Sequence, residues 1–220
     1  METDYLTVKA AGKHELESKK SRFIADLGRV TTEAEAQAFL NDVIAREPKA
    51  THHCWAYVLG DHDYIQRESD NGEPSGTAGV PILTVLQRNH LRNTIAVVTR
   101  YFGGIKLGAG GLIRAYSNAT STGIEAVGVV KRVQQRAVQI TVNYPHYDQL
   151  THYLEENHLI VLQTLYTQVV QITIGVDLAA VEATTQALTD LLNDRLDIKL
   201  GDVAYHEVPV EIHASSRDDA

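Results

Sequence analysis

The sequence predicts an α+β protein with two domains, and three observations lead to this class. Strand-like and helix-like segments alternate along all 220 residues, of which 44% are hydrophobic and 22% charged, as in ordinary globular proteins. The net charge is +1 over residues 1–135 and −9 over residues 136–220. The predicted strands and helices after about residue 135 also follow a different order from those before it. We therefore expect domains at 1–135 and 136–210, with a flexible tail at 211–220.

The beginning of the first domain predicts short strands followed by a helix. Apolar residues in the segments 5–8 and 21–30 favour strands. Thr32 followed by Glu35 is the pattern of a capping box, which marks the start of a helix. Apolar positions continue at helical spacing until Pro48, where we expect the helix to have ended.

The middle of the first domain predicts further strands and helices separated by glycine-rich loops. Aromatic and β-branched residues favour strands at 53–59 and near 64–67. The nearly continuous apolar run at 94–102 predicts a strand buried on both faces. Helical spacing predicts helices at 80–88 and 112–126, the second closed by a glycine.

The second domain predicts the order strand, helix, strand, strand, helix, strand. A proline begins its first helix, and Asp177 is expected to cap its second. This βαββαβ order is that of the ferredoxin-like fold. The expected elements are strands at 136–142, 160–166, 169–176 and 199–210, with helices at 145–157 and after Asp177.

The segment 103–111 (G-G-I-K-L-G-A-G-G) is the strongest candidate site. It lies between a buried strand and a helix, where free backbone N–H groups and the helix dipole favour anions. Its glycines allow close approach of a ligand to the backbone. The alternative is that the glycines serve only tight turning. The expected phosphate-contacting residues are Arg100, Lys106 and Arg114, with Gly103, Gly104, Gly108, Gly110 and Gly111.

The loop at 69–79 (S-D-N-G-E-P-S-G-T-A-G) is a second candidate, since it also leads into a helix. Ser75, Thr77 and nearby amides suit a second anion cradle, although Thr77 is equally explained as a helix cap. Asp70 and Glu73 suit an acid/base pair or a Mg²⁺ site, a weaker interpretation because no third oxygen ligand is identifiable.

His52, His53 and Cys54 carry no recognisable metal spacing, so we predict no metal and no cofactor. The two histidines are retained as candidate contacts to an anionic ligand. Cys54 lies inside a predicted strand beside Trp55, which indicates a core position and not a nucleophile. A single cysteine excludes an internal disulfide. The absence of a signal-like N-terminus and of a long apolar run predicts a cytoplasmic protein without a membrane partner.

The two glycine-rich segments together resemble the YigZ/IMPACT family. The element S-R-F-I at 21–24, the pair His52-His53 and the predicted second domain also fit bacterial members. The resemblance covers about residues 5–205. The positions that match the family signature in type and spacing are Gly79, Ile82, Leu83, Leu86, Leu91, Val97, Val98, Arg100, Tyr101, Phe102, Gly103, Gly104, Leu107 and Gly108.

The resemblance implies a fold more clearly than a reaction. It implies that the first domain is a β-α domain of the ribosomal-protein second-domain type. The second domain would resemble the C-terminal domain of elongation factor G. Eukaryotic relatives act in translational control by competing for the activator of a starvation-sensing kinase, partly through a domain that this chain lacks. Some bacterial members carry a dipeptidase label, for which no metal-ligand set is found here.

We therefore expect a non-enzymatic factor that binds RNA or the ribosome and modulates translation or its stress response, with a protein partner in translational control. Replacing Arg100 and Lys106 with alanine is expected to weaken binding and leave the fold intact. One alternative is an enzyme or binding protein for a small phosphorylated ligand or nucleotide, with 103–111 as its phosphate cradle. A second alternative is a protein-interaction module. We assign no catalytic residue.

Overall fold

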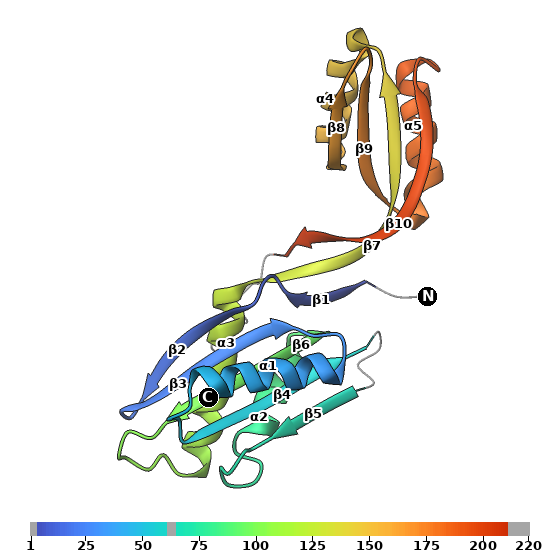
Figure 1. The fold of residues 1–220 in the computed structure, drawn as a ribbon. Coiled ribbons are helices and arrows are strands. Elements are labelled where there is room, and N and C mark those ends of the chain that lie inside the picture. The colour runs from blue at the N-terminus through green and yellow to red at the C-terminus, as the bar shows by residue number, and fades with distance from the viewer. Residues whose placement is uncertain (1–3, 61–64, 211–220) are drawn as a thin grey trace. The chain divides into compact units, whose positions relative to one another are not determined.

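The chain forms two compact units in the computed structural model, which describes residues 4–60 and 65–210. The units comprise Tyr5–Lys131 and Arg132–Glu207, and each is described by itself (Figure 1). The expected tail at 211–220 lies outside the described residues, as does residue 64 of the strand expected near 64–67.

The first unit is built on an antiparallel sheet of five strands. Strands are found where the sequence predicts them at 21–30, 53–59 and 94–102. The central strand is buried along nearly its whole length, as its continuous apolar run predicts, because helices cover both faces of the sheet. The spatial order is β2 (Gly12–Ser18), β3 (Ser21–Arg29), β6 (Thr94–Tyr101), β4 (His52–Leu59) and β5 (Ile65–Ser69).

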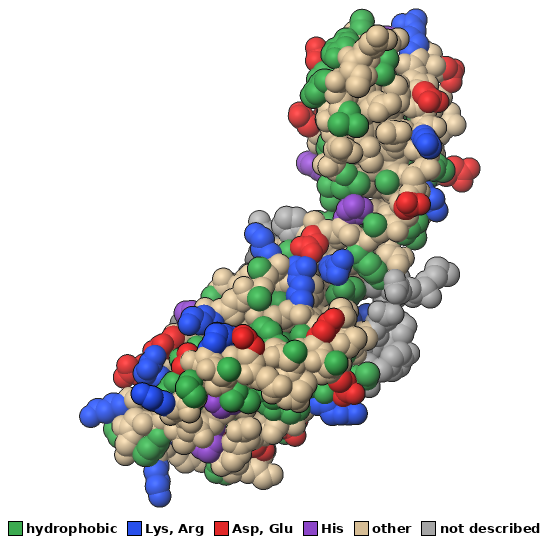
Figure 2. All heavy atoms as spheres, in the orientation of Figure 1, with side chains coloured by type: hydrophobic (Ala, Val, Ile, Leu, Met, Phe, Trp, Pro, Cys, Tyr) green, Lys and Arg blue, Asp and Glu red, His purple; other side chains and the backbone are tan. Residues whose placement is uncertain are grey.

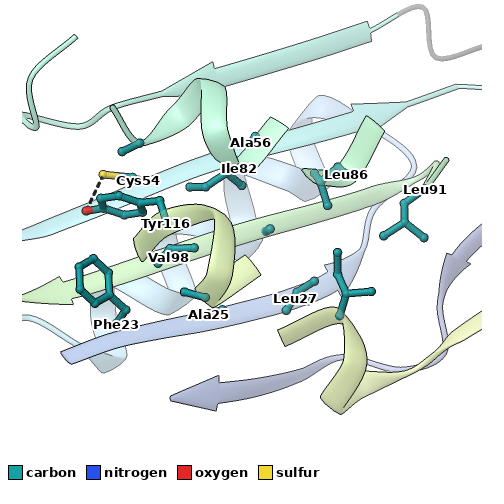
Figure 3. Close-up of a cluster of buried hydrophobic side chains, with 14 of the residues drawn as sticks. Phe23, Ala25, Leu27, Cys54, Ala56, Ile82, Leu86, Leu91, Val98 and Tyr116 are labelled. Carbon is teal, nitrogen blue, oxygen red and sulfur yellow. Dashed lines mark hydrogen bonds between the residues drawn. The ribbon is translucent and has the colours of Figure 1, made fainter. Parts of the chain in front are cut away.

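Helix α1 (Glu33–Arg46) packs on one face of this sheet, and α2 (Gly79–Arg88) and α3 (Ala109–Val127) pack on the other. Figure 3 shows the second interface, where Phe23 and Leu27 of the sheet meet Ile82 and Leu86 of α2 and Tyr116 of α3. Burying these side chains stabilises the fold by about 25 cal/mol for each Å² of apolar surface removed from water. The core therefore holds α2 and α3 against this face of the sheet.

The predicted helix boundaries hold where a specific residue sets them. The Thr32 hydroxyl accepts from the Glu35 amide at 3.1 Å, so Thr32 is the N-cap of α1 as predicted. Helix α3 is closed by Gly128 (φ 76°), as predicted. Its start was placed too late: α3 begins at Ala109 and not at residue 112, directly after Gly108 (φ 73°), so Gly110 and Gly111 lie in its first turn. Strand β2 was not predicted, because its sequence G-K-H-E-L-E-S carries a single apolar residue, Leu16.

The second unit has the predicted βαββαβ order. Its sheet has the order β10-β7-β9-β8. Strand β1 (Tyr5–Val8) belongs to the first unit. Ile140, Ile172 and Leu150 are among the buried side chains between sheet and helices. The elements are β7 (Val129–Val142), a 3₁₀ turn (Tyr144–His146), α4 (Tyr147–Glu156), β8 (Ile160–Tyr166), β9 (Val170–Asp177), a second 3₁₀ turn (Leu178–Ala180), α5 (Val181–Leu192) and β10 (Asp197–Pro209).

Two expectations for the second unit need correction. Strand β7 begins at Val129 and not at residue 136. Asp177 does not cap a helix with its side chain; its carboxylate accepts a hydrogen bond from Gln135 Nε2 at 2.9 Å. Helix α5 starts at Val181, after the 3₁₀ turn, and so lies beyond the reach of that carboxylate. Among the described residues no helix is both long and apolar enough to cross a membrane.

Candidate functional site

The candidate residues of the first domain meet at one end of its sheet. Strand β6 ends there at Tyr101 and leads through residues 102–108 into α3, while β4 begins there at His52. Strand pairing places Arg100 directly opposite both His52 and Phe23. Because residues opposite each other in a sheet point to the same face, these three side chains share the face covered by α2 and α3.

Arg100 is a buried side chain with an internal partner. It is 5% exposed, and its Nη1 donates to Glu73 Oε1 at 2.6 Å. Its guanidinium also lies over the rings of Phe23 and Phe102, 5.5 and 5.6 Å from their centroids. The sequence places Arg100 at the head of an anion loop, but the anion it meets is a carboxylate of the same chain.

Glu73 joins Arg100 to a buried polar network. The Tyr116 hydroxyl donates to Glu73 Oε1 at 2.9 Å. Cys54 Sγ lies 2.9 Å from the Asp70 carbonyl oxygen and 3.3 Å from the Tyr116 hydroxyl (Figure 3). Burial, ahead of its acidic neighbours, raises the pKa of the Cys54 thiol to about 12, and burial likewise raises the pKa of Tyr116. Cys54 is therefore a protonated core thiol at neutral pH.

Asp70 occupies the anion position at the start of α2. Its carboxylate accepts from the backbone amides of Gly76, Ala78 and Gly79 at 2.7, 2.8 and 2.9 Å. Burial tends to raise the pKa of Asp70, but these amides outweigh it and hold the pKa below its usual range. The backbone amides expected to bind an external anion at 69–79 are therefore occupied by a side chain of the same loop.

The other polar residues of this loop have structural roles or face solvent. Thr77 is buried and does not cap α2, although a cap was one expectation for it. The amides at the start of the helix already donate to Asp70, and the Thr77 hydroxyl donates to the Pro74 carbonyl at 2.6 Å. Ser75 is exposed. Neither side chain lines the cavity described below.

The start of α3 differs from the start of α2. Its N-cap is Gly108, and no side chain caps it. The first helical hydrogen bond is donated by the Leu112 amide, so the preceding amides of the first turn have no partner within the helix. A Cβ at Gly110 would have only Arg114 Nη1 near it, at 3.9 Å. Neither packing nor backbone conformation therefore requires glycine at position 110.

Other glycines of the segment 103–111 have structural reasons. A Cβ at Gly103 would collide with the backbone of Lys20, and the Gly103 amide donates to Ser21 Oγ at 3.1 Å. This contact holds the loop against the turn between β2 and β3. Gly104 has a φ of 83°, a conformation that favours glycine. A Cβ at Gly111 would press on Leu107 Cβ at 3.0 Å.

A cavity of about 370 Å³ opens between the two loops. Arg100 and Glu73 lie in its wall, with Lys106 and the first residues of α3. Phe102 is also in the wall and remains 49% exposed. The remaining lining is apolar, from Pro74, Leu107, Ala109 and Leu112. The site thus combines an apolar hollow, an exposed aromatic ring and a helix N-terminus.

Arg114 lines a separate hollow of about 260 Å³ with Lys19. Glu17 is its acidic lining residue, and Leu107 separates this hollow from the cavity, since it lines both. We name the exposed bases Lys19, Lys20, Lys106 and Arg114 the basic end of the domain. Figure 2 shows Lys and Arg side chains gathered near the turn between β2 and β3, with acidic side chains among them.

The two histidines point to opposite faces. His52 Nδ1 lies 2.8 Å from the Asn71 carbonyl oxygen, which can only accept, so this nitrogen carries the proton. His52 Nε2 is 4.0 Å from Glu73 Oε2. His53 is buried on the other face, 3.1 Å from the Thr99 hydroxyl, and burial lowers its pKa. The structure does not bring His53 to the cavity.

Sequence reasoning missed the partners of these residues. Tyr116 is an apolar-face position of a helix, and only the folded structure brings its hydroxyl to Glu73. Lys19 and Lys20 were not among the predicted site residues, although these two adjacent bases before the strand at 21–30 are a signal that could have included them. Among residues 4–60 and 65–210, no group of three or more His, Cys, Asp or Glu is placed to hold a metal ion.

The fold and site define a class of two-domain α+β proteins. Residues 19–124 match the model of the Impact N-terminal domain, and residues 140–195 match a domain of unknown function, DUF1949. A crystal structure described as that of an hypothetical protein superposes with a TM-score of 0.58, at 30% identity, over 90% of this chain and 97% of that one.

Bacterial and animal proteins named for the IMPACT family are similar to this chain. The IMPACT family member YvyE of Bacillus subtilis is 46% identical, over 94% of this chain and 95% of its own length. An IMPACT family member of Haemophilus influenzae is 36% identical over 90% and 97%. Protein IMPACT of Oryctolagus cuniculus is 30% identical over 41% of this chain and 29% of its own. The chain belongs to the IMPACT family.

Proposed function

We propose that this protein is a non-enzymatic factor that binds RNA, including the RNA of the ribosome, and so modulates translation or its stress response. The observation that carries the proposal is the basic end, where Lys19, Lys20, Lys106 and Arg114 are exposed around an uncapped helix N-terminus. In a protein of net charge −8, this gathering of bases suits a polyanion. The translational role follows the family resemblance.

The polar network beside the cavity supports a binding role over catalysis. Glu73 already accepts from Arg100 and Tyr116, and the Asp70 carboxylate accepts three backbone amides. A general base needs a free oxygen within hydrogen-bond reach of substrate. Both oxygens of Asp70 accept backbone amides, and Cys54 is protonated at neutral pH. Glu73 accepts both of its hydrogen bonds on Oε1, where Arg100 and Tyr116 hold it in the wall of the cavity.

The cations that face solvent differ from those that the sequence ranks first. Arg100 is buried against Glu73, so it does not serve as an exposed phosphate contact. Replacing it would leave a buried carboxylate without its cation, so the double replacement of Arg100 and Lys106 is not expected to leave the fold intact. Lys106 is exposed and is the appropriate single test.

Co-sedimentation with ribosomes and with bulk RNA, over a series of salt concentrations, tests the proposal. We expect binding that weakens with salt, and we expect Lys106→Ala to lower the slope of log affinity against log salt by about 0.7 for a single-stranded contact. Arg88→Ala is the matched control, because Arg88 is an exposed base in the last turn of α2, away from the site. Absence of binding at low salt would refute the proposal.

A small phosphorylated ligand is the second candidate, favoured by the 370 Å³ cavity with Arg100 and Lys106 in its wall. This volume is within the range of roughly 300–1,000 Å³ that small-molecule sites occupy. A nucleotide that raises the melting temperature, while RNA and ribosomes fail to bind, would replace the first proposal with this one.

A further inference from the structure

The cavity beside the basic end has the composition of a site for a planar, partly apolar group. Its apolar lining includes the side chains of Phe102, Leu107 and Leu112. Its polar lining includes Arg100 and Glu73, a donor and an acceptor held together at 2.6 Å. Nucleobases combine an apolar face with donors and acceptors on the edge, and both features are matched here.

Phe102 is held in position and yet remains accessible. The Arg100 guanidinium lies 5.6 Å from the centroid of its ring, and Arg100 is itself fixed by Glu73. The ring is nevertheless 49% exposed. Exposed aromatic rings on which bases stack are the recurrent feature of proteins that bind single-stranded nucleic acid. Because Phe102 is already oriented, stacking would not require a further side chain to be ordered.

Arg100 supplies an independent indication of a ligand. The residue is 5% exposed and lines the cavity, and its Nε has no hydrogen-bond partner among the described residues. A buried N–H without an acceptor destabilises a protein, so native structures rarely leave one. An acceptor atom on a ligand in the cavity would satisfy it.

The cavity also borders a position for a phosphate. Gly108 and Ala109, where α3 begins, lie in its wall beside Lys106. The amides of the first turn have no side-chain cap, and a Cβ-free surface at Gly110 allows an anion to approach. The lining of this one cavity therefore offers contacts for a base and contacts for a phosphate.

We propose that this cavity binds one unpaired nucleotide of single-stranded RNA, with the base on Phe102 and a phosphate at the N-terminus of α3 beside Lys106. The inference rests on the proposed function and adds the form of RNA that is recognised. A paired base is stacked within a duplex and cannot enter the hollow, so the site distinguishes single strands from duplexes.

Fluorescence anisotropy with the full chain tests this inference. The probes are one labelled RNA strand without self-complementarity and the same strand annealed to its complement. We expect Phe102→Ala to weaken single-strand binding about tenfold and to leave duplex binding unchanged. Ile105→Ala is the matched control, since Ile105 is an exposed apolar residue of the same loop that does not line the cavity.

The outcomes separate the inference from the proposed function. No loss on the single strand, or an equal loss on both probes, overturns the nucleotide pocket, while salt-sensitive binding that persists leaves the proposed function in place. Failure of the unaltered protein to bind either probe at low salt overturns both.

Uridine monophosphate distinguishes free nucleotides from RNA as the source of the ligand. If it raises the melting temperature of the unaltered protein but not of Phe102→Ala, and neither RNA binds, the RNA source is overturned and the free nucleotide replaces it. If the single strand binds with the expected dependence on Phe102, the inference is supported whether or not the monophosphate also binds.

Discussion

Two glycine-containing loops of the first domain each lead into a helix, but the helices begin in different ways. The loop before α2 carries Asp70, whose carboxylate accepts from the amides at the helix start. The loop before α3 ends at Gly108 and provides no side-chain cap. Both loops have the composition of an anion cradle, so composition alone does not distinguish them.

The difference shows that an anion position can be used by the chain itself. In the loop at 69–79, Asp70 and Glu73 serve as internal anions for helix amides and for Arg100. In the loop at 102–108, no acidic residue is present, and Lys106 is exposed. The first loop is therefore closed by its own carboxylates, whereas the second remains open to a ligand.

Removing Arg100, the cation on β6 that pairs with Glu73 of the first loop, is expected to have the largest effect on stability. We expect Arg100→Ala to lower the free energy of unfolding by about 3–5 kcal/mol, because Glu73 would stay buried without its ionic partner. Denaturant unfolding measures the change. Combining Arg100→Ala with Glu73→Gln should recover part of the loss, and a double variant no more stable than Arg100→Ala would contradict this account.

Removing the carboxylate that closes the first loop has a smaller effect. We expect Asp70→Ala to lower the free energy of unfolding by about 2 kcal/mol, since the α2 amides lose their cap. The same denaturant measurement applies, with Ser75→Ala as the control because Ser75 is an exposed hydroxyl of the same loop. Equal stability of the two variants would show that Asp70 does not close the loop.

The low pKa of Asp70 also predicts a dependence on pH. The folded pKa lies below the unfolded value, so the ionised carboxylate stabilises the fold, fully so above the unfolded pKa of about 3.9. This contribution is lost as the pH falls through the folded pKa. The stability difference between the unaltered protein and Asp70→Asn should therefore shrink on acidification, and a constant difference would exclude the carboxylate as its cause.

Adding one methyl group to the open helix start is the smallest perturbation. We expect Gly110→Ala to stabilise the protein by about 0.5 kcal/mol, since its Cβ would meet only Arg114 Nη1, at 3.9 Å. We also expect it to weaken RNA binding. Gly111→Ala is the control, because its Cβ would press on Leu107 and so should not stabilise. Unchanged RNA affinity in Gly110→Ala would show that the ligand does not approach this turn.

Much of the fold could be predicted because local signals and burial agree. The apolar run of β6 and the glycine that closes α3 are such signals. Strand β2 escaped prediction because it is an edge strand with polar residues, held by its pairing with β3. The prediction that Asp177 caps a helix was wrong, because its carboxylate accepts a hydrogen bond from Gln135, which is distant in sequence.

The site could be predicted in location but not in its pairings. Gly103 and Lys106 lie where the sequence places them, between β6 and α3. The contact of Arg100 with Glu73 joins residues 27 positions apart through a loop whose path the sequence does not define. Which base is exposed and which is paired depends on that path, so Arg100 and Lys106 could not be separated beforehand.

The reactivity of the single cysteine can be used to follow opening of the first domain. Cys54 is fully buried beneath the site, and burial raises the pKa of its thiol to about 12, so a thiol-modifying reagent reacts only when the domain opens. The rate at which Cys54 is labelled therefore measures how often the domain opens, and no cysteine has to be introduced by mutation. A ligand that binds over Arg100 and Glu73 would suppress those events and slow the reaction in proportion to its occupancy.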